Sequence, residues 1–185
     1  MTPFPSPRLP LLLLFSAVLT AVLSVGPSSA AAATELVRQV CDKTGDSRYC
    51  FAALYSDPRT PNADAYSLAY ISFGLAYLNA THTRDHISRL LSSPALADRS
   101  PTLTSSLQSC RRGYAAAVAK LAAAYNDLNA ETFAGLAEYS GGGARAAGDC
   151  DRTFGSSPYA PLMAGRNRDL TRLCEICTAV SKLFT

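Results

Sequence analysis

The chain has 185 residues, of which 48% are hydrophobic and 17% are charged, and its formal net charge is +3. This composition is too apolar for a disordered protein, and the small net charge argues against a nucleic-acid binder. The length suits one domain with a substantial core, while two histidines are too few for a histidine-rich metal centre.

The first thirty residues have the three-part pattern of a secretory signal peptide. Arg8 precedes an uncharged apolar run at residues 11–25, and small residues follow at 28–30. An uncleaved membrane anchor is the alternative, but the run is shorter than the roughly 20 residues that cross a bilayer. We expect cleavage after Ala30 or one of the next three alanines, giving a signal peptide at residues 1–30, a domain at residues 31–185 and no membrane attachment afterwards.

Residues 36–50 and 51–54 suggest two short helical pieces that form a hairpin. Cys41 and Cys50 flank a polar stretch that contains Gly45, so the two flanks can fold back on each other. In an oxidising compartment all cysteines are candidates for disulfides, and the spacing does not choose among the fifteen pairings of six. They are Cys41, Cys50, Cys110, Cys150, Cys174 and Cys177.

Residues 68–91 are predicted to form a long helix that ends at Ser92-Ser93-Pro94. Its apolar residues recur at steps of three and four: Leu68, Ile71, Leu75 and Leu78. Asn79 begins an N-glycosylation acceptor sequence, Asn-Ala-Thr. His82 and His86 have a spacing that can hold zinc, but no third ligand is apparent. We therefore favour a solvated helix face and expect no metal.

The next two helices are predicted from residue 103 onward. The apolar side of the first consists of Leu103, Leu107, Cys110, Tyr114, Leu121, Tyr125 and Leu128. The second is expected to begin near Ala130 and to carry Phe133 and Leu136. Each glycine at positions 141–143 costs a helix about 1 kcal/mol relative to alanine. We expect a break there, with a shorter helix resuming near Ala144.

The last predicted helix has its apolar residues at Leu170, Leu173, Cys174, Cys177, Val180 and Phe184. Cys174 and Cys177 form a C-x-x-C sequence, which in redox proteins lies at a helix N-terminus after a strand. Here it lies in the middle of a helix among apolar residues. Buried thiols are the favoured interpretation, ahead of a local or intermolecular disulfide and of a catalytic redox pair.

Strand signals are nearly absent, so the fold class is predicted as all-α, an up-and-down four-helix bundle with an N-terminal helical hairpin. A search for catalytic sequences finds no serine elbow, phosphate-binding glycine loop or EF-hand loop. The acidic residues are spread among basic ones. The sequence therefore weighs against an enzyme, and we expect no catalytic residues and no cofactor.

Four cysteine-containing segments follow one another between residues 36 and 184. They are residues 40–50, residues 107–110 with Tyr114, residues 144–151 with Phe154, and residues 173–183. In this order they resemble the opening hairpin and the later helices of the plant invertase and pectin methylesterase inhibitor family. The resemblance implies a bundle stapled by the disulfides Cys41–Cys50 and Cys110–Cys150. For these loops the chain-entropy model gives about 2.7 and about 3.9 kcal/mol.

The same resemblance matches Cys174 to the unpaired cysteine of many members, whereas Cys177 departs from the family pattern. It implies a secreted protein of the apoplast or cell wall that forms a 1:1 complex with pectin methylesterase and covers its substrate cleft. The alternatives are an inhibitor of acid invertase, in the cell wall or the vacuole, and a non-inhibitory helical binding protein. Four side chains are available as interface anchors without being assigned: Arg111, Arg112, Tyr139 and Arg145.

Overall fold

The structure is a computed structural model that describes residues 29–93 and 100–185. Its helices are α1 (Ser29–Cys41), α2 (Ser47–Leu54), α3 (Ala65–Leu91), α5 (Pro101–Asn129), α6 (Leu136–Phe154) and α7 (Pro161–Ser181). Two 3-10 turns, η1 (Thr60–Asn62) and η2 (Lys182–Phe184), complete it, and the described residues contain no strand. The predicted all-α class is confirmed. Nearly all of the predicted signal peptide lies outside the described residues.

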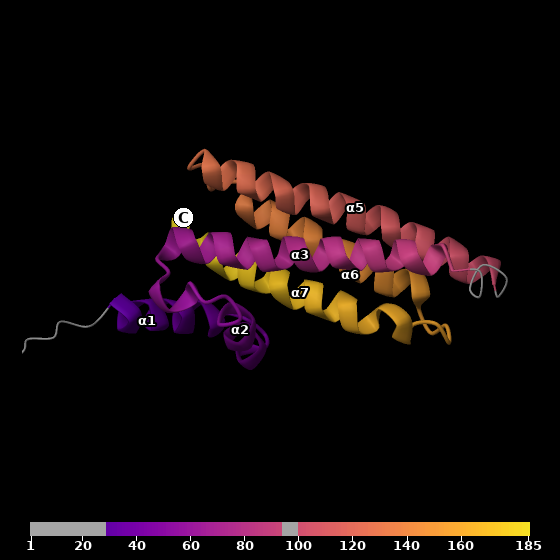
Figure 1. Ribbon diagram of the computed structural model, residues 1–185, viewed down its shortest axis with the longest axis horizontal. Helices are drawn as coiled ribbons and strands as arrows, with labels where there is room; N and C mark the ends of the chain where they lie inside the picture. Colours follow the sequence, from indigo (N-terminus) through magenta and orange to yellow (C-terminus); the bar gives the residue numbers. More distant parts are fainter. Residues whose placement is uncertain (1–28, 94–99) are drawn as a thin grey trace, which may run out of the picture.

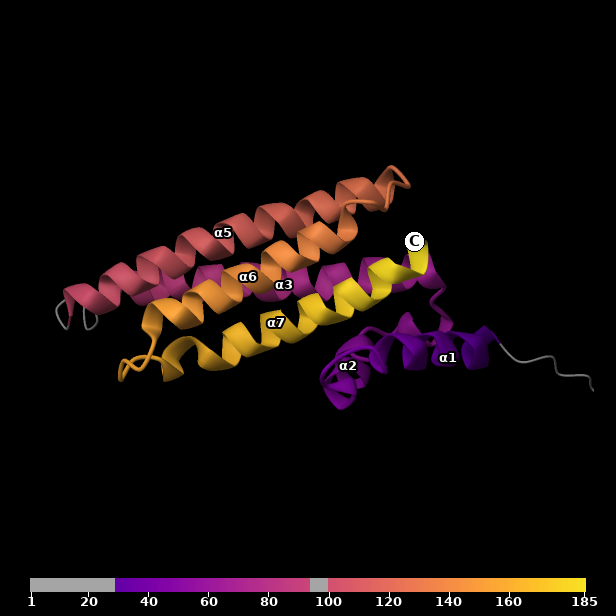
Figure 2. The same ribbon diagram turned by 180° about the vertical axis from the view of Figure 1, so that it is seen from behind.

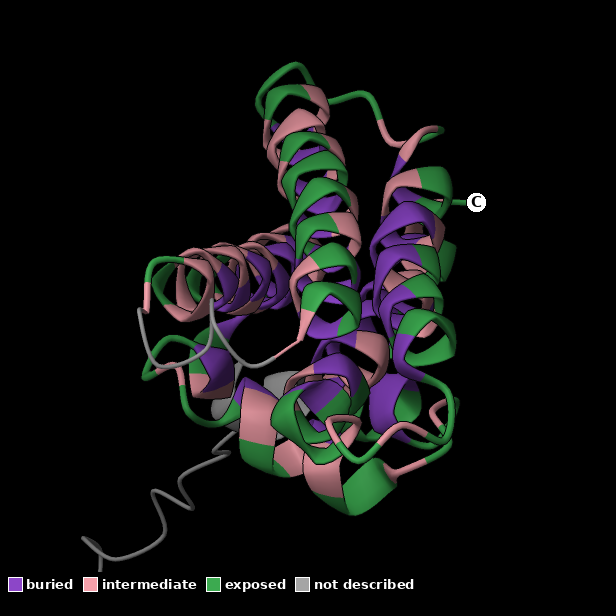
Figure 3. Ribbon diagram, turned by 90° about the vertical axis from the view of Figure 1, so that its right-hand side faces the viewer, coloured by how far each residue is buried: buried purple, intermediate pink, exposed green. Residues whose placement is uncertain are grey.

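Helices α3, α5, α6 and α7 run side by side as an up-and-down bundle (Figures 1 and 2). Each packs against the next in the chain, and α7 closes the ring by packing against α3. The α1–α2 hairpin lies outside this ring, where it contacts mainly η1 and α7. Buried residues face the inside of the bundle and exposed ones the outside (Figure 3). No helix in the described part of the chain is long and apolar enough to cross a bilayer.

Side-chain caps fix where three of the helices begin. Asp46 accepts a hydrogen bond from the backbone N–H of Tyr49 at 2.9 Å and starts α2. Asp64 and Ser100 cap α3 and α5 in the same way. Such caps satisfy N–H groups that have no partner within the helix. The boundary predicted at residues 50–51 is therefore wrong, because the cap at Asp46 places the turn of the hairpin at residues 42–46.

The buried face of α3 differs from the predicted one at its centre. Leu68 and Ile71 are buried as expected, but the side chain of Leu78 is 51% exposed. The buried face continues instead through Ala76 and Ala80. Because alanine side chains are small, neighbouring helices can come close to α3 along Ala76 and Ala80. This face of α3 points into the bundle, and Leu78 remains on the outside.

The predicted start of the third long helix near Ala130 is also wrong. Helix α5 continues to Asn129, and the chain then reverses through Glu131, whose φ is +53°. Thr132 donates from its backbone N–H to the carbonyl of Asp127 at 2.8 Å, which closes the turn. Phe133 consequently lies in a loop, and α6 begins at Leu136.

Helix α6 continues without a break through the three glycines, contrary to the prediction. A Cβ added to Gly142 would lie 2.2 Å from Cδ of Lys120, and one added to Gly143 would lie 2.6 Å from Sγ of Cys174. The glycines therefore let α5 and α7 approach the backbone of α6. Contacts across these two approaches offset the low helix propensity of glycine.

Candidate partner-binding surface

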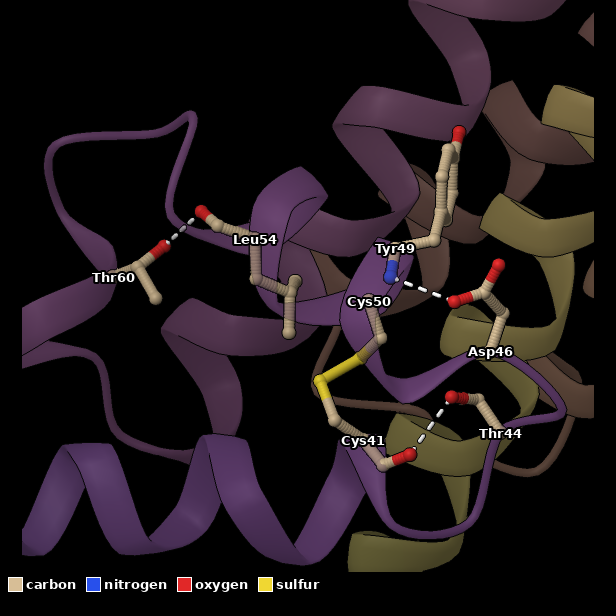
Figure 4. Close-up of a disulfide and its surroundings, with 7 residues drawn as sticks. All are labelled: Cys41, Thr44, Asp46, Tyr49, Cys50, Leu54 and Thr60. Carbon is tan, nitrogen blue, oxygen red and sulfur yellow. Dashed lines mark hydrogen bonds between the residues drawn. A yellow bond between two sulfur atoms is a disulfide. The ribbon is translucent and has the colours of Figure 1, made fainter.

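The turn of the hairpin is closed by a disulfide and by local hydrogen bonds (Figure 4). Cys41 and Cys50 are joined, with their Cα atoms 5.4 Å apart. Thr44 donates its hydroxyl to the carbonyl of Cys41 at 2.8 Å, while Asp46 caps α2. Thr60 is fully buried and donates to the carbonyl of Leu54. The hairpin and its connection to α3 thus form a small unit with internal bonds of its own.

One arginine attaches this unit to the bundle. Arg172 on α7 pairs with Asp46, with Nη2 and Oδ2 2.9 Å apart, and its guanidinium lies 5.1 Å from the ring centre of Tyr49. The Tyr49 hydroxyl donates to the backbone carbonyl of Asp169 at 3.4 Å. Burial, together with the Asp169 carboxylate, raises the pKa of Tyr49 to about 12. The sequence analysis missed this clamp, because its partners are far apart in the chain.

The second disulfide joins α5 to α6 beside a buried polar chain. Cys110 and Cys150 are paired, with their Cα atoms 4.8 Å apart. One turn further along α5, Tyr114 donates its hydroxyl to Oδ1 of Asn167 at 2.7 Å. Asn167 in turn donates to Oδ1 of the exposed Asp151 at 2.5 Å. Burial raises the pKa of Tyr114, so its phenol remains a hydrogen-bond donor. The arrangement fixes α5, α6 and α7 relative to one another.

Cys174 and Cys177 are unpaired and buried, with 1% and 0% of their surfaces exposed. Burial raises the pKa of the Cys174 thiol to about 12 and that of Cys177 well above its ordinary value. Both therefore stay protonated, whereas redox chemistry needs an accessible thiolate. Their role is to fill the core between α7 and its neighbours.

The other polar motifs lie on α3. His82 is exposed and His86 is half-buried. Burial and the nearby Arg166 and Arg89 lower the pKa of His86. Within the described residues, no cluster of three or more His, Cys, Asp or Glu residues could hold a metal ion. Asn79 is half-buried, and its Oδ1 has no hydrogen-bond partner among the residues that the structure describes.

Three of the four candidate anchors lie on the outer side of α5 and α6. Arg111, Arg112 and Arg145 are exposed, while Tyr139 is half-buried against the core. Small residues separate the arginines: Ala115, Ala116 and Ala119 on α5, and Gly141, Ala144 and Gly148 on α6. We call these residues, with the three arginines, the α5–α6 face.

The two helices of the α5–α6 face are joined by an ion pair and by a disulfide. Lys120 on α5 pairs with Glu138 on α6, with Nζ and Oε1 3.3 Å apart, and the buried disulfide Cys110–Cys150 also joins the two helices. The hairpin packs on the other side, against α7 (Figures 1 and 2). Between its arginines the face carries alanines and glycines, which lose no side-chain entropy when a partner binds.

Residues 35–180 match the family described as "Plant invertase/pectin methylesterase inhibitor". A pectinesterase inhibitor of Actinidia deliciosa is 28% identical over 92% of this chain and 93% of its own length. A cell wall / vacuolar inhibitor of fructosidase 2 of Arabidopsis thaliana is 33% identical over 66% of this chain and 67% of its own length. These relatives are inhibitor proteins and not enzymes, as the sequence analysis expects.

Solved structures show the same fold. The crystal structure of a mutant form of a pectin methylesterase inhibitor from Arabidopsis covers 80% of this chain and 95% of its own, with a TM-score of 0.69 and 18% identity. A second pectin methylesterase inhibitor from Arabidopsis thaliana has a TM-score of 0.60 and 16% identity, over 82% of this chain and 97% of its own. With the family match across the hairpin and all four bundle helices, the chain belongs to the plant invertase/pectin methylesterase inhibitor family.

Proposed function

We propose that this protein inhibits pectin methylesterase by binding it 1:1 and covering its substrate cleft. The observation that carries the proposal is the alignment with the Actinidia deliciosa pectinesterase inhibitor over nearly the whole length of both chains. The likeness in fold to two pectin methylesterase inhibitors supports it. Inhibition would be steric, because a rigid helical surface that fills the cleft keeps substrate out.

The α5–α6 face is the part of the bundle that we assign to the enzyme. Its three arginines can form charge-assisted hydrogen bonds to carboxylates on the surface of the enzyme. Its alanines and glycines let the helix backbone come close to the cleft walls. An interface of standard size would bury about 1,600 Å² in total, an area that two adjacent helices can supply.

Invertase is the second candidate target. The observation that favours it is the 33% identity to the Arabidopsis inhibitor of fructosidase, which exceeds the 28% identity to the pectinesterase inhibitor. That alignment covers a shorter part of both chains. The same face of the bundle would then close the entrance to the sucrose site of the enzyme.

The test is a titration of the oxidised protein, residues 31–185, against a plant pectin methylesterase and a plant acid invertase at mildly acidic pH. We expect stoichiometric loss of esterase activity with invertase unaffected. Loss of invertase activity alone would identify invertase, and not pectin methylesterase, as the target enzyme. If properly folded protein inhibits neither enzyme across several isoforms, the inhibitor proposal is wrong.

Replacing Arg111 and Arg112 together by alanine tests the assigned face. Loss of such anchors costs an interface about 2 kcal/mol or more, so we expect inhibition to weaken at least about tenfold. The matched control is Arg48→Ala, since Arg48 is an exposed arginine on α2. Equal weakening by both changes would contradict the assignment of the α5–α6 face.

We further propose that residues 1–30 are removed during secretion and that the protein acts in the apoplast, with the vacuole as the alternative. The name of the Arabidopsis relative includes both cell wall and vacuolar locations. N-terminal sequencing of the protein from plant tissue gives the cleavage site. Asn79 is the proposed glycan attachment site, and a mass loss on glycosidase treatment that disappears in Asn79→Gln would establish it.

A further inference from the structure

A groove beside the start of α3 has no role in the function proposed above. It is lined by Pro58, Arg59, Asn62, Tyr66, Ser67 and Tyr70, and we call it the tyrosine groove. Its volume is about 550 Å³, which is in the usual range for small-molecule sites. Its residues belong to the η1 connection and to the first turns of α3, so none of them belongs to the α5–α6 face.

The two tyrosine rings are held in place by bonds at their far ends. Tyr66 donates its hydroxyl to the carbonyl of Leu128 at 2.8 Å, and Tyr70 donates to Oδ1 of Asn129. The ring centres are 5.1 Å apart and the rings are inclined by 60° to each other. The hydroxyls are thus used inside the protein, while the rings offer fixed apolar walls. When a ligand packs on these rings, little side-chain entropy is lost, because the rings are already ordered.

Of the other lining residues, Pro58, Ala63 and Ile71 are apolar, while Arg59 and Asn62 bring hydrogen-bond donors at the rim. The guanidinium of Arg59 and the amide of Asn62 are both exposed there. A pyranose ring fits this combination, since its C–H face packs on an aromatic ring and its hydroxyls accept from N–H groups. Proline-rich peptides also use aromatic grooves. Such a peptide needs donors to its carbonyls along the rings, and both phenol hydroxyls already donate elsewhere.

The charged residues at the tyrosine groove indicate whether its ligand is an acidic or an uncharged sugar. Arg59 is held by Asp57, with Nη2 and Oδ2 2.6 Å apart. Hydrogen bonds from Arg59 lower the pKa of Asp57, and the bond from the Ser67 backbone lowers that of Asp64. Both carboxylates stay ionised in mildly acidic solution. Arg59 is the one cationic residue among the lining residues that the structure describes, and its ion pair with Asp57 already neutralises it, so the groove offers no free cation to a uronate.

We infer that the tyrosine groove binds an uncharged pyranose unit of an oligosaccharide, such as a neutral hexose or a uronic acid methyl ester. The inference stands independently of enzyme inhibition, because it uses other residues. As a consequence, the protein could bind a polysaccharide through the tyrosine groove while the α5–α6 face binds the enzyme.

The experiment is a titration of the ¹⁵N-labelled protein, followed by NMR, with a fully methyl-esterified oligogalacturonide and with the free acid of the same length. We expect the ester to shift the amide signals of Tyr66, Ser67 and Tyr70, and the free acid to bind several-fold more weakly. Equal binding of the two, or no shift with either at millimolar concentration, would overturn the inference. So would a proline-rich peptide that shifts the same signals when the ester does not.

Variants separate loss of binding from loss of fold. Tyr70→Ala should weaken binding of the ester about tenfold, the effect of losing one good aromatic contact. Tyr70→Phe keeps the ring and should retain binding. Asn62→Ala changes an exposed side chain and should weaken binding in protein that stays folded. The control is Tyr55→Ala, because Tyr55 is a 39% exposed tyrosine that directly follows α2. An equal loss in the control would contradict the site, while inhibition measured on the same samples reports on the proposed function separately.

Discussion

Gly143 on α6 faces Cys174 on α7 across a space too small for a methyl group, since an added Cβ would lie 2.6 Å from the thiol sulfur. Gly143→Ala should therefore lower the free energy of unfolding by about 1–2 kcal/mol, because overpacking outweighs the gain in helix propensity. Urea unfolding measures this change. Gly165→Ala is the control, as nothing lies within 4 Å of its added Cβ, and it should stabilise the protein.

The same contact makes a prediction for the double variant. Cys174→Ala removes the sulfur that the new methyl group would meet, so Gly143→Ala should cost less in that background. A double-mutant cycle gives the coupling between the two positions. Additive effects would show that the strain of Gly143→Ala arises elsewhere.

The hydrogen bond from Tyr114 to Asn167 joins two fully buried side chains. Tyr114→Phe leaves Oδ1 of Asn167 without this donor in a dry environment, and we expect a loss of about 1–3 kcal/mol in unfolding free energy. Tyr55→Phe is the matched control, because the Tyr55 hydroxyl bonds Thr34 at the surface. The control should change stability by less than about 0.5 kcal/mol. Equal effects in the two variants would contradict the role of the buried bond.

The buried thiols predict that stability falls in alkaline solution. The unfolded chain loses thiol protons near the ordinary pKa, whereas the folded protein keeps them, because burial raises the pKa of Cys174 to about 12 and that of Cys177 still more clearly above normal. Their contribution is complete below a pH of about 8.5 and declines above it by about 1.4 kcal/mol per pH unit for each thiol.

Unfolding free energies measured between neutral pH and about pH 9 test this, because no more than about a tenth of the tyrosines in the unfolded chain are ionised in that range. A variant with both Cys174→Ala and Cys177→Ala should show a flatter pH profile, even if it is less stable overall. A slope unchanged by the two substitutions would mean that other groups cause the decline.

The clamp at Arg172 predicts a local effect. Arg172→Ala removes its ion pair with Asp46 and its contact with the Tyr49 ring, both partly exposed, so the global loss should be only about 1 kcal/mol. Hydrogen exchange in α2 should become faster, with α5 unchanged. Arg48→Ala, also a loss of an arginine but from the exposed side of α2, should leave exchange as it is. Faster exchange throughout the bundle would contradict a local clamp.

The apolar face of α5 was predictable because large side chains carry its pattern. Leu103, Leu107, Tyr114, Leu121 and Leu128 recur at helical spacing, and all are buried. A strong helical period of large apolar residues determines which face of the helix is buried. The disposition of four such helices as a bundle followed from the same patterns and from the short connections between them.

The faces built from small residues could not be found in this way. Leu78 fits an apolar period but is exposed, because the neighbours of α3 approach along Ala76 and Ala80. Gly142 and Gly143 suggest a break by propensity, yet their value lies in contacts with Lys120 and Cys174 on other helices. Helix propensity is a property of one helix alone, whereas the residue that suits each of these positions depends on the side chains of the neighbouring helices.

The candidate site likewise contains residues that can be predicted from the sequence and contacts that cannot. The arginines of the α5–α6 face can be selected as candidates from the sequence, because arginine is a frequent anchor in protein interfaces. The clamp between Arg172 and Asp46 and the ring pair of the tyrosine groove are not visible, as their geometry depends on how separate elements dock. No local pattern encodes such contacts.

The two disulfide loops follow one another along the chain and do not interlock, since one spans residues 41–50 and the other residues 110–150. On the secretory route proposed above, each can close as soon as its own segment has been translocated. Cys174 and Cys177 are the last cysteines to arrive, and docking of α7 then withdraws both from oxidants. The order of synthesis therefore protects correct pairing: by the time a wrong thiol is present, the four correct partners have had the opportunity to bond.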